Sequence, residues 1–491
     1  MAKGKADPVE IELKLDFEPA DRTRLRAALA ALQARGSTRH LVSTYFDTPE
    51  RDIAKAGYVL RVRRDGRRRV QTVKAVASAA AGLFERAEWE HPLRGGRPCF
   101  DDRSGPLAHA VGAHALGRLE PLFLTDVHRT VFRIDAASAA IELALDEGEC
   151  RADVRVAPIC ELELELRSGT PRALFDLARR LNEAVPLRLG VRSKSERGGA
   201  LLLGASPSAW KAEPIALDCD HDAADAFRTI AQACIRQFRL NETLLLHSGE
   251  AEALHQARVG LRRLRTAFSL FGPFFADDPQ AALLREELRW LAAELGGVRN
   301  IDVLIPRFEG ETRAALTAAR DDAFEHVRIA LAGARTRLLM IDLVEWLALG
   351  TWRSEPAHPG RLEQDGIAFA SDVLEARRDR LAHRGEGLAG LGPKRRHQVR
   401  IEAKKLRYAA EFFASLYGGD KARRRHARFL GSIEALQDQL GELNDLAIGP
   451  ALLEGLGIDA ELPKSGKRCR RHILDRAEQA YRALLHAKRF W

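Results

Sequence analysis

The hexapeptide ELELEL, residues 161–166, places a glutamate at every second position of a short run. In an extended chain successive side chains point to opposite faces, so Glu161, Glu163 and Glu165 would share one face and three leucines the other. Like charges at this spacing repel one another. The stretch therefore predicts a β-strand whose acidic face needs cations opposite it.

The same alternation recurs over residues 9–200, in VEIELKL, YVLRVRR, RVQTVKAV, FERAEWEHPL, HRTVFRI and AIELALD. Alternating apolar and polar residues are typical of half-buried strands, and turn residues such as Asp65-Gly66 bound several of the runs. Two stretches with helical spacing, roughly 19–35 and 171–185, interrupt them. Seven or eight antiparallel strands in this length indicate a barrel or a sandwich.

The pattern changes after SPSAWKAEPIAL, residues 206–217, which we predict to be a linker between a domain of residues 1–205 and one of residues 218–491. Ala, Leu, Arg and Glu then dominate with helical periodicity. HQARVGLRRLRTAFSLF, from His255, is echoed by HQVRIEAKKLRYAAEFF, from His397, and LGGVRNID (295–302) by LGELND (440–445). The similar spacing predicts an all-α region of two sub-bundles related by a pseudo-two-fold axis.

Length and composition limit the class of protein. A chain of 491 residues exceeds one ordinary core, and 46% hydrophobic with 30% charged residues is typical of a soluble globular protein. No apolar run is long enough to span a bilayer, and the start, MAKGKADPVE, lacks the apolar core of a secretory signal. Six cysteines lie scattered without CxxC or zinc-ligand spacing. We expect a cytoplasmic protein without a membrane partner.

Bulk charge identifies no polyanionic partner. The net charge is +9, with a pI near 9.4, and it is shared almost evenly between the two halves of the chain. A polyanion would therefore have to be bound by patterned rather than by total charge.

Charges on the N-terminal strands are segregated by sign, with glutamates on some strands and Arg or Lys on others. One alternative is a set of solvated outer faces around a barrel filled with leucine and valine. Outer faces usually mix signs, however. If the charged faces point into a closed barrel, the glutamates can hold divalent cations and the basic side chains can grip an oligophosphate.

This segregation resembles the CYTH, or triphosphate tunnel metalloenzyme, superfamily over roughly residues 8–205. Its ExExK signature is present as Glu10-Ile11-Glu12-Leu13-Lys14. Further pieces follow in the family's order: YFDTP (45–49), LRVR (60–63), TVK (72–74), RAEWE (86–90), ELELEL and SKSERG (193–198). The resemblance implies an eight-stranded antiparallel β-tunnel with flanking helices that hydrolyses or cyclises triphosphates with Mg²⁺ or Mn²⁺, as a pair of ions.

The resemblance also implies roles for individual residues. The metal carboxylates would be Glu10, Glu12, Glu161, Glu163, Glu165 and Asp146. The triphosphate-binding residues would be Lys14, Arg61, Arg63, Lys74, Arg129, Arg133 and Lys194. The catalytic residues would be Glu88, Glu90 and Lys14, with the two glutamates as metal ligands, as groups that position water, or as both. The register leaves open which two glutamates of ELELEL contact the metals, and Glu163 is our first choice.

Two basic stripes mark the helical half. His255, Arg258, Arg262 and Arg265 follow a spacing that places them on one side of an α-helix, with Arg263 at the edge. The second copy repeats the stripe with His397, Arg400, Lys404, Lys405 and Arg407. Adjacent cations repel one another unless an anion joins them. A solvated face paired with acidic neighbours is the alternative, but solvation does not demand the same stripe twice.

These segments resemble the CHAD family, a conserved-histidine α-helical domain, from about residue 220 to 485. The resemblance implies two four-helix bundles that bind inorganic polyphosphate through the residues of both stripes. One departure is Asn300 in RNID, where an Asp is often found. Aromatic residues make up only 6% of the chain and do not interleave with the stripes, so we do not expect a nucleic-acid partner.

Taken together, the sequence predicts an α+β multidomain enzyme that hydrolyses inorganic triphosphate in a metal-dependent β-tunnel and binds polyphosphate with its helical half. Absence of a Walker-type GxxxxGK[ST] loop argues against an ATPase of that kind. We expect it in the cytoplasm, in association with polyphosphate granules. An alternative is a polyphosphate-binding or granule protein without catalysis. A third is adenylate cyclase or thiamine triphosphatase activity.

Overall fold

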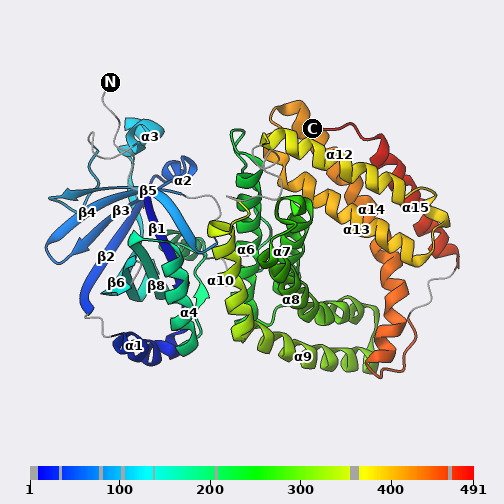
Figure 1. Ribbon diagram of the computed structural model, residues 1–491, viewed down its shortest axis with the longest axis horizontal. Coiled ribbons are helices and arrows are strands. Elements are labelled where there is room, and N and C mark those ends of the chain that lie inside the picture. The colour runs from blue at the N-terminus through cyan, green and yellow to red at the C-terminus, as the bar shows by residue number, and fades with distance from the viewer. Residues whose placement is uncertain are drawn as a thin grey trace. The chain divides into compact units, whose positions relative to one another are not determined.

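The chain forms two compact units, one of residues 1–208 with 332–349 and one of residues 209–331 with 350–491 (Figure 1). The computed structural model describes residues 9–32, 36–76, 81–100, 106–136, 139–204, 208–353, 364–462 and 467–491. Residues 332–349 come from the helical half of the sequence but pack with the first unit. The two units therefore do not follow a single cut in the chain, and the linker at 206–217 stays a prediction.

Eight antiparallel strands of the first unit close into a ring (Figure 1). They are β1 (Val9–Asp16), β2 (Gly36–Asp47), β3 (Tyr58–Asp65), β4 (Arg68–Ala75), β5 (Leu83–Leu93), β6 (Glu120–Ala136), β7 (Ala139–Ala152) and β8 (Arg155–Gly169). The order β5-β4-β3-β2-β6-β7-β8-β1 is completed by pairing of β1 with β5. A short strand, β9 (Arg188–Leu189), pairs with β1. The predicted eight-stranded antiparallel tunnel is confirmed.

The strand register puts charged residues of β1, β6, β7 and β8 on one face of the sheet. Lys14 stands opposite Glu163, and Arg129 stands opposite Asp146. Ion pairs also skip over an intervening strand, from Arg129 on β6 to Glu163 on β8. Side chains can meet across such a gap only on the concave side of a closed sheet, so the charged face is the interior.

The apolar face is the exterior, and helices cover it. Leu13, Leu15, Leu162 and Leu164 are completely buried, and α4 (Arg172–Ala184) packs against both β1 and β8. On β3 and β4, an apolar cluster packs with Ile53 of α2 (Asp52–Lys55) and Leu107 of α3 (Leu107–Leu116). The alternative of leucines inside and solvated carboxylates outside is therefore wrong.

Helix α5 (Lys194–Leu203) carries a basic side chain into the ring. A capping box of Ser193 and Glu196 fixes the start of the helix, so the first helical residue, Lys194, is held at the strands and is 8% exposed. A Cβ on Gly198 would lie 2.1 Å from the ring of Phe123, so only glycine permits this close packing. The other helices of the strand region are α1 (Arg22–Ala31) and, from residues 334–349, α10.

Helix α10 (Ala334–Leu349) is joined to α4 by polar contacts. Arg179 of α4 pairs with Asp342 at 2.7 Å and also with Glu345. Arg337 donates from Nε to Oδ1 of Asn182 at 2.8 Å, and the same oxygen accepts the backbone N–H of Leu187 at 3.0 Å. Asn182 thereby ties α10 to the turn that leads into β9.

The second unit repeats a four-helix order. The first copy has α6 (Ala223–Ser248), α7 (Ala251–Leu270), α8 (Pro279–Leu304) and α9 (Gly310–Ala332), and the second α12 (Gly366–Arg384), α13 (Pro393–Phe412), α14 (Asp420–Gly455) and α15 (Lys467–His486). Equivalent helices meet: α6 contacts α12, α7 contacts α13 and α8 contacts α14. Like-to-like contact is what a pseudo-two-fold axis produces. In the part of the chain described, no helix is long and apolar enough to cross a membrane.

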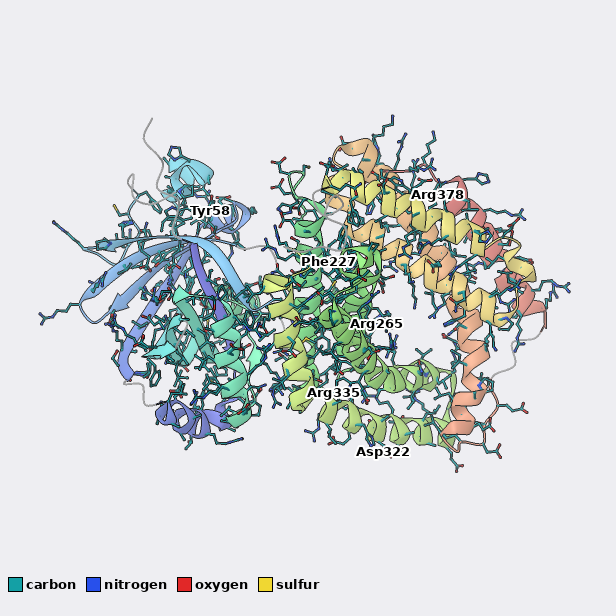
Figure 2. All side chains as sticks on the ribbon, in the orientation of Figure 1. Tyr58, Phe227, Arg265, Asp322, Arg335 and Arg378 are labelled. Carbon is teal, nitrogen blue, oxygen red and sulfur yellow. The ribbon has the colours of Figure 1, made fainter. Side chains whose placement is uncertain are left out.

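An aromatic core sits within this helical unit, around Phe227 of α6 (Figure 2). Its ring centroid lies 5.6 Å from that of Phe268, 5.1 Å from that of Phe271 and 5.4 Å from that of Trp352. Aromatic pairs at these separations contribute to stability beyond the area they bury. This core anchors α7 and so fixes the helix that carries the first basic stripe.

Replacing Asn182 with Ala should lower the free energy of unfolding by about 2–3 kcal/mol, because two buried donors lose one shared acceptor. Urea denaturation measures the effect. Arg180→Ala, an exposed change on the same helix, should leave the midpoint within error. Equal midpoints for the two variants would contradict the role assigned to Asn182.

Candidate functional site

Three carboxylates meet inside the tunnel. Oxygen atoms of Asp146, Glu161 and Glu163 all lie within 4.8 Å of one another. Asp146 of β7 is paired in register with Glu161 of β8, and Glu163 follows on the same face. Asp146 and Glu161 are fully buried. Three anions this close require either cations or a metal ion.

Two lysines supply part of the positive charge. Lys194 Nζ lies 2.7 Å from Asp146 and 2.8 Å from Glu163, and it also contacts Glu161. Lys14 Nζ lies 3.0 Å from Glu163 and 3.6 Å from Glu161. These ammonium groups occupy the centre of the carboxylate cluster. They are cations of the kind that the acidic face of residues 161–166 was predicted to need.

Arg129 completes the arrangement from the neighbouring strand. It donates from Nε and Nη2 to the two oxygens of Asp146, at 2.7 and 2.6 Å, and it also bonds to Glu163. Such a two-pronged pair is stronger than a single charged hydrogen bond. Because Asp146 and Glu161 are fully buried and Glu163 is only slightly exposed, these interactions are screened less than ion pairs at the surface.

The protonation states follow from this environment. Burial alone would raise the pKa of Glu163, but Arg129, Lys194 and Lys14 outweigh burial and hold its pKa well below the ordinary value. The pKa of Asp146 is likewise lowered, against the effect of burial, by Arg129 and Lys194. Burial disfavours the Lys194 ammonium, yet Asp146, Glu161 and Glu163 raise its pKa well above normal. All these groups are charged at neutral pH.

A second cluster of charges lies on β3, β4 and β5. Glu88 contacts Lys74 and lies 3.6 Å from Arg61. Glu90 lies 3.0 Å from Arg63, and it accepts the hydroxyl of Thr72 at 2.9 Å. In the ring order, β3 stands opposite β8 and β4 opposite β7. The basic residues of β3 and β4 therefore face the acidic cluster across the interior.

The remaining predicted residues differ in how they relate to these clusters. Glu12 borders the first cluster: it is buried, its carboxylate lies 3.8 Å from Lys14, and its charge helps to raise the pKa of Arg129. Glu165 pairs with Arg167, away from the three clustered carboxylates. Arg133 is exposed. Glu10 belongs to β1, but its side chain lies outside the described residues.

Sequence reasoning missed one interior pair. Arg197 of α5 lies 2.6 Å from Asp16 and 3.8 Å from Glu161. Asp16 shares the strand parity of Lys14, and Arg197 follows Lys194 by three residues, so it lies on the same helical face. Parity and helical spacing were the signals that could have found them.

The acidic cluster suits a hard divalent cation. Carboxylate oxygens are the ligands that Mg²⁺ and Mn²⁺ prefer. Glu161 Oε2 is buried and accepts no hydrogen bond, and Nη2 of Arg197 lies 3.8 Å from it, so this oxygen has no close donor. A metal ion at Asp146, Glu161 and Glu163 would have to move at least one lysine from its present partners.

The helical unit brings part of both basic stripes together. The positive charges of Arg258 and Arg262 on α7, and of Arg400 on α13, all help to lower the pKa of Lys404 on α13. None of the described carboxylates forms an ion pair with any of these four residues. Burial, and then Arg262, Arg400 and Arg258, lower the pKa of Lys404 to about 7. We call Arg258, Arg262, Arg400 and Lys404 the cation cluster.

Both histidines border this cluster in different ways. His397 Nδ1 lies 2.8 Å from Oδ1 of Asn444. His255 Nδ1 is buried without a hydrogen-bond partner. Burial, Arg299 and Arg262 lower the pKa of His255 to about 4, so its imidazole is neutral at physiological pH.

The remaining stripe residues are not in the cation cluster. Arg263 pairs with Glu411, and Arg407 lies 2.8 Å from Glu411 and 3.0 Å from Glu434. Lys405 lies 3.7 Å from Glu402. Arg265, which is labelled in Figure 2, is exposed. For these four residues, the predicted grouping by helical spacing is not what the structure brings together.

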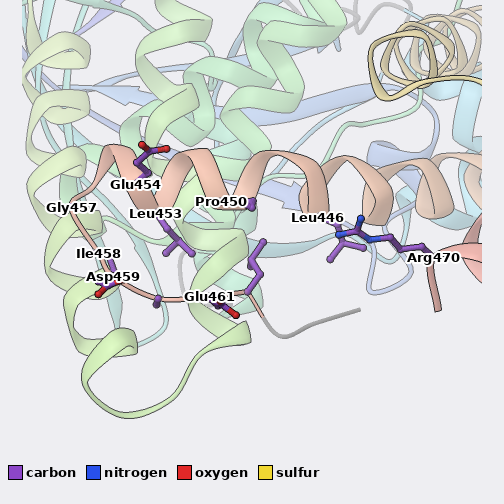
Figure 3. Close-up of a pocket in the computed structure, with 11 residues that line it drawn as sticks. Leu446, Pro450, Leu453, Glu454, Gly457, Ile458, Asp459, Glu461 and Arg470 are labelled. Atoms are coloured by element: carbon purple, nitrogen blue, oxygen red, sulfur yellow. The ribbon is translucent and has the colours of Figure 1, made fainter. Parts of the chain in front are cut away.

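A pocket of about 560 Å³ opens at the end of α14, away from every predicted residue (Figure 3). Leu446, Pro450 and Leu453 line it, with Glu454 and Glu461 at its edge. It contains neither clustered cations nor the carboxylates of the tunnel, so it has no part in the sites described above.

Two family models match different ranges of the chain. Residues 9–198 match the CYTH domain, and residues 229–454 match the CHAD domain. An inorganic triphosphatase of Haemophilus influenzae is 31% identical over 202 residues, which cover 40% of this chain and 55% of that protein. The chain therefore spans about half the length of that relative.

Two solved structures are similar to separate parts of the chain. The CHAD domain from the plant Ricinus communis is 29% identical, with a TM-score of 0.48, and the match covers 57% of this chain and 98% of that one. A putative adenylyl cyclase from Hippeastrum, described as having a dominant triphosphatase activity, is 20% identical with a TM-score of 0.33. That match covers 39% of this chain and 95% of the other.

Asp146→Asn should lower the free energy of unfolding of the metal-free protein by about 3 kcal/mol at pH 7, because Arg129 is left buried beside too few anions. The pKa of Asp146 is lowered by folding, so its contribution is full above the ordinary value of about 3.9 and is lost as the pH falls through the folded-state pKa. Urea denaturation at several pH values should show the difference from wild type shrinking in acid.

The matched control for this change is Asp135→Asn, an exposed position on β6, which should unfold like the wild type at every pH. A difference for Asp146→Asn that stays constant down to pH 2 would contradict the assignment.

Proposed function

Because the chain joins a CYTH domain to a CHAD domain, we propose that its tunnel hydrolyses inorganic triphosphate with divalent metal ions and that its helical half binds inorganic polyphosphate. The observation that carries the first part is the carboxylate cluster of Asp146, Glu161 and Glu163, buried in a closed ring and faced by basic side chains. The inorganic triphosphatase among the relatives supports this choice of substrate.

Opposite sides of the tunnel would bind different parts of the substrate complex, the metal ion on one side and phosphate oxygens on the other. Asp146, Glu161 and Glu163 would hold Mg²⁺ or Mn²⁺, which supplies charge neutralisation of the phosphate chain and activation of water when bound. Arg61 and Arg63, on the strand opposite β8, would hold phosphate oxygens through their planar guanidinium groups. A polyanion between the two faces then meets opposite charge on each side.

Lys14 and Lys194 would have anionic partners both in the metal-free protein and with metal and substrate bound. Lys14 and Lys194 pair with carboxylates in the structure. If those carboxylates held a divalent cation, the two ammonium groups would be able to pair with phosphate oxygens instead. Each buried charge would then have a partner both before and after the substrate binds, which avoids the cost of an unpaired buried ion.

Hydrolysis would proceed by attack of water in line with the bond to the terminal phosphorus. The new bond joins the water oxygen to that phosphorus, and the bridging P–O bond breaks. Pyrophosphate leaves with the bond's electron pair, and the water's proton passes to a carboxylate. Glu88 and Glu90, held by Lys74 and Arg63, are the carboxylates proposed to orient this water.

The proposal for the helical half depends on uncompensated charge. The cation cluster lies on two helices in contact, α7 and α13, and lacks ion-pair partners among the described residues. A linear phosphate chain supplies negative charge at short, regular intervals and requires no base-stacking surface. Association with polyphosphate granules in the cytoplasm is the cellular setting we propose.

Glu163→Gln should reduce phosphate release from tripolyphosphate by about 100-fold or more, because this residue contacts all three central cations. Chelation of divalent ions with EDTA should abolish release by the wild type. The measurement is a colorimetric phosphate assay with Mg²⁺ or Mn²⁺, run beside ATP, thiamine triphosphate and long polyphosphate.

Glu120→Gln, an exposed carboxylate at the start of β6, is the control and should retain wild-type turnover. Full turnover by Glu163→Gln would refute the tunnel site. Preferential release from thiamine triphosphate, or formation of cyclic AMP from ATP, would refute the proposed substrate. Polyphosphate binding without release from any triphosphate would leave only a binding protein.

Polyphosphate affinity should fall as the pH rises above 7. In the free protein Lys404 has a pKa of about 7, with Arg258, Arg262 and Arg400 lowering it and Asp445 raising it. A bound polyanion raises the pKa, so binding takes up a proton, and affinity drops by up to about tenfold per pH unit until the bound-state pKa is reached. Titration calorimetry at fixed ionic strength from pH 6 to 9 measures the slope.

Lys404→Arg isolates this proton, because arginine stays charged throughout the range. We expect similar affinity to wild type at pH 6 and tighter binding at pH 9. Lys394→Arg, an exposed position on the same helix, should keep the wild-type slope. Identical slopes for Lys404→Arg and wild type would remove Lys404 from the site.

A further inference from the structure

The two copies of the helical repeat differ at the positions that border the cation cluster. Alignment of LGGVRNID (295–302) with LGELND (440–445) places Arg299 opposite Asn444 and Asn300 opposite Asp445. The first copy thus has an extra cation where the second has an amide. It has an amide where the second has a carboxylate.

The structure shows what these exchanges do in the second copy. Asn444 is engaged by His397, at 2.8 Å. Asp445 raises the pKa of both Arg400 and Lys404, so it partly compensates their charge, and its carboxylate also lies 3.4 Å from Arg307. The two cations contributed by α13 therefore already have an anion nearby.

In the first copy the anion lies two positions further along. Asn300 is exposed and carries no charge, and the next carboxylate, Asp302, is paired with Arg320 at 3.2 Å and also raises the pKa of Arg258. Arg299 is half-buried and forms no ion pair with the residues that the structure describes. The positive charge of Arg299 helps to lower the pKa values of both His255 and Arg258.

Packing between α7 and α8 sets Arg258 beside Arg299. Arg258 Nη1 donates to the carbonyl of Ala292 at 3.4 Å, and a Cβ on Gly296 would lie 3.1 Å from the same nitrogen. Glycine at 296 therefore lets the guanidinium lie against α8. Position 299 is one turn further along the same helical face, so the two guanidinium groups are neighbours.

We propose that Arg299 is a phosphate-binding residue and that the α7–α8 half of the site, with Arg258, Arg262 and Arg299, is the stronger half for a polyphosphate chain. The proposal rests on polyphosphate binding by the helical unit. Three guanidinium groups lie on this side, whereas α13 contributes one arginine and one lysine, and the position equivalent to Arg299 holds an amide, Asn444, engaged by His397. A duplicated fold thereby carries a site that is not symmetric.

The test exchanges residues between equivalent positions of the repeat. Arg299→Asn copies position 444 into the first half, and Asp445→Asn copies position 300 into the second. Affinity for inorganic polyphosphate of defined length is measured in EDTA, so that divalent ions do not assist the tunnel. Arg285→Asn removes the same charge from an exposed position on α8 and serves as the control.

We expect Arg299→Asn to weaken binding about tenfold, the loss of one charged hydrogen-bond donor, and to lower the slope of log affinity against log salt by about one. Asp445→Asn should tighten binding severalfold, and Arg285→Asn should match the wild type. The salt slope separates loss of a phosphate contact from a change in folding.

Wild-type affinity from Arg299→Asn, with an unchanged salt slope, would overturn the inference while polyphosphate binding stands. No binding by the wild type would overturn polyphosphate binding itself, and the inference with it. Should Arg299→Asn fail to fold, Asp445→Asn and Arg299→Lys decide: unchanged affinity in the first, or a tenfold loss in the charge-preserving second, contradicts the asymmetric site.

Discussion

Closing eight alternating strands into a ring obliges the protein to bury charge. Once the leucine faces are covered by helices on the outside, the carboxylates of β7 and β8 have only the interior to occupy. Buried ions are tolerated only when they are paired and hydrogen-bonded. Lys14, Lys194 and Arg129 meet this requirement from three different elements, β1, α5 and β6. The remaining features of the tunnel, including the capped start of α5, follow from it.

The tunnel and the helical surface treat charge in opposite ways. In the tunnel every clustered carboxylate has a basic partner, so a metal ion bound there would have to displace ammonium groups. In the cation cluster burial and mutual repulsion lower the pKa of Lys404 and Arg258, which means that these cations are held together at a cost. A bound polyanion would relieve that cost. One site is thus compensated before its ligand arrives, and the other is not.

Alternation in the sequence predicted antiparallel strands in a barrel or a sandwich, and the resemblance to the CYTH superfamily implied the closed ring with its charges inside. Strand parity placed Glu161 and Glu163 on one face of their strand, and the register sets Lys14 opposite Glu163 and Arg129 opposite Asp146. Strand parity could not separate Glu165 from the two glutamates of the carboxylate cluster, although Glu165 pairs with Arg167 near the end of the strand. Neither could it assign α10 to the first unit, because its contacts with α4 join residues more than 150 positions apart.

Helical spacing was a weaker guide in the second unit. It predicted that Arg263, Lys405 and Arg407 would share the stripes, but acidic residues at 402, 411 and 434 take them as partners. A stripe on one helix does not reveal the charges that the neighbouring helices bring. The place of Arg299 beside Arg258 likewise depends on the packing of α8 against α7, which spacing within one helix does not show.

Anomalous diffraction from crystals grown with Mn²⁺ and tripolyphosphate is the most direct test of whether carboxylates and basic side chains inside the ring bind a metal ion and a phosphate chain together. The account predicts an anomalous peak inside the ring, bounded by carboxylate oxygens of Asp146, Glu161 and Glu163 at about 2.0–2.3 Å, with Lys14 or Lys194 moved onto phosphate. A ring without a manganese peak, with both lysines still on their carboxylates and the phosphate chain bound elsewhere, would contradict it.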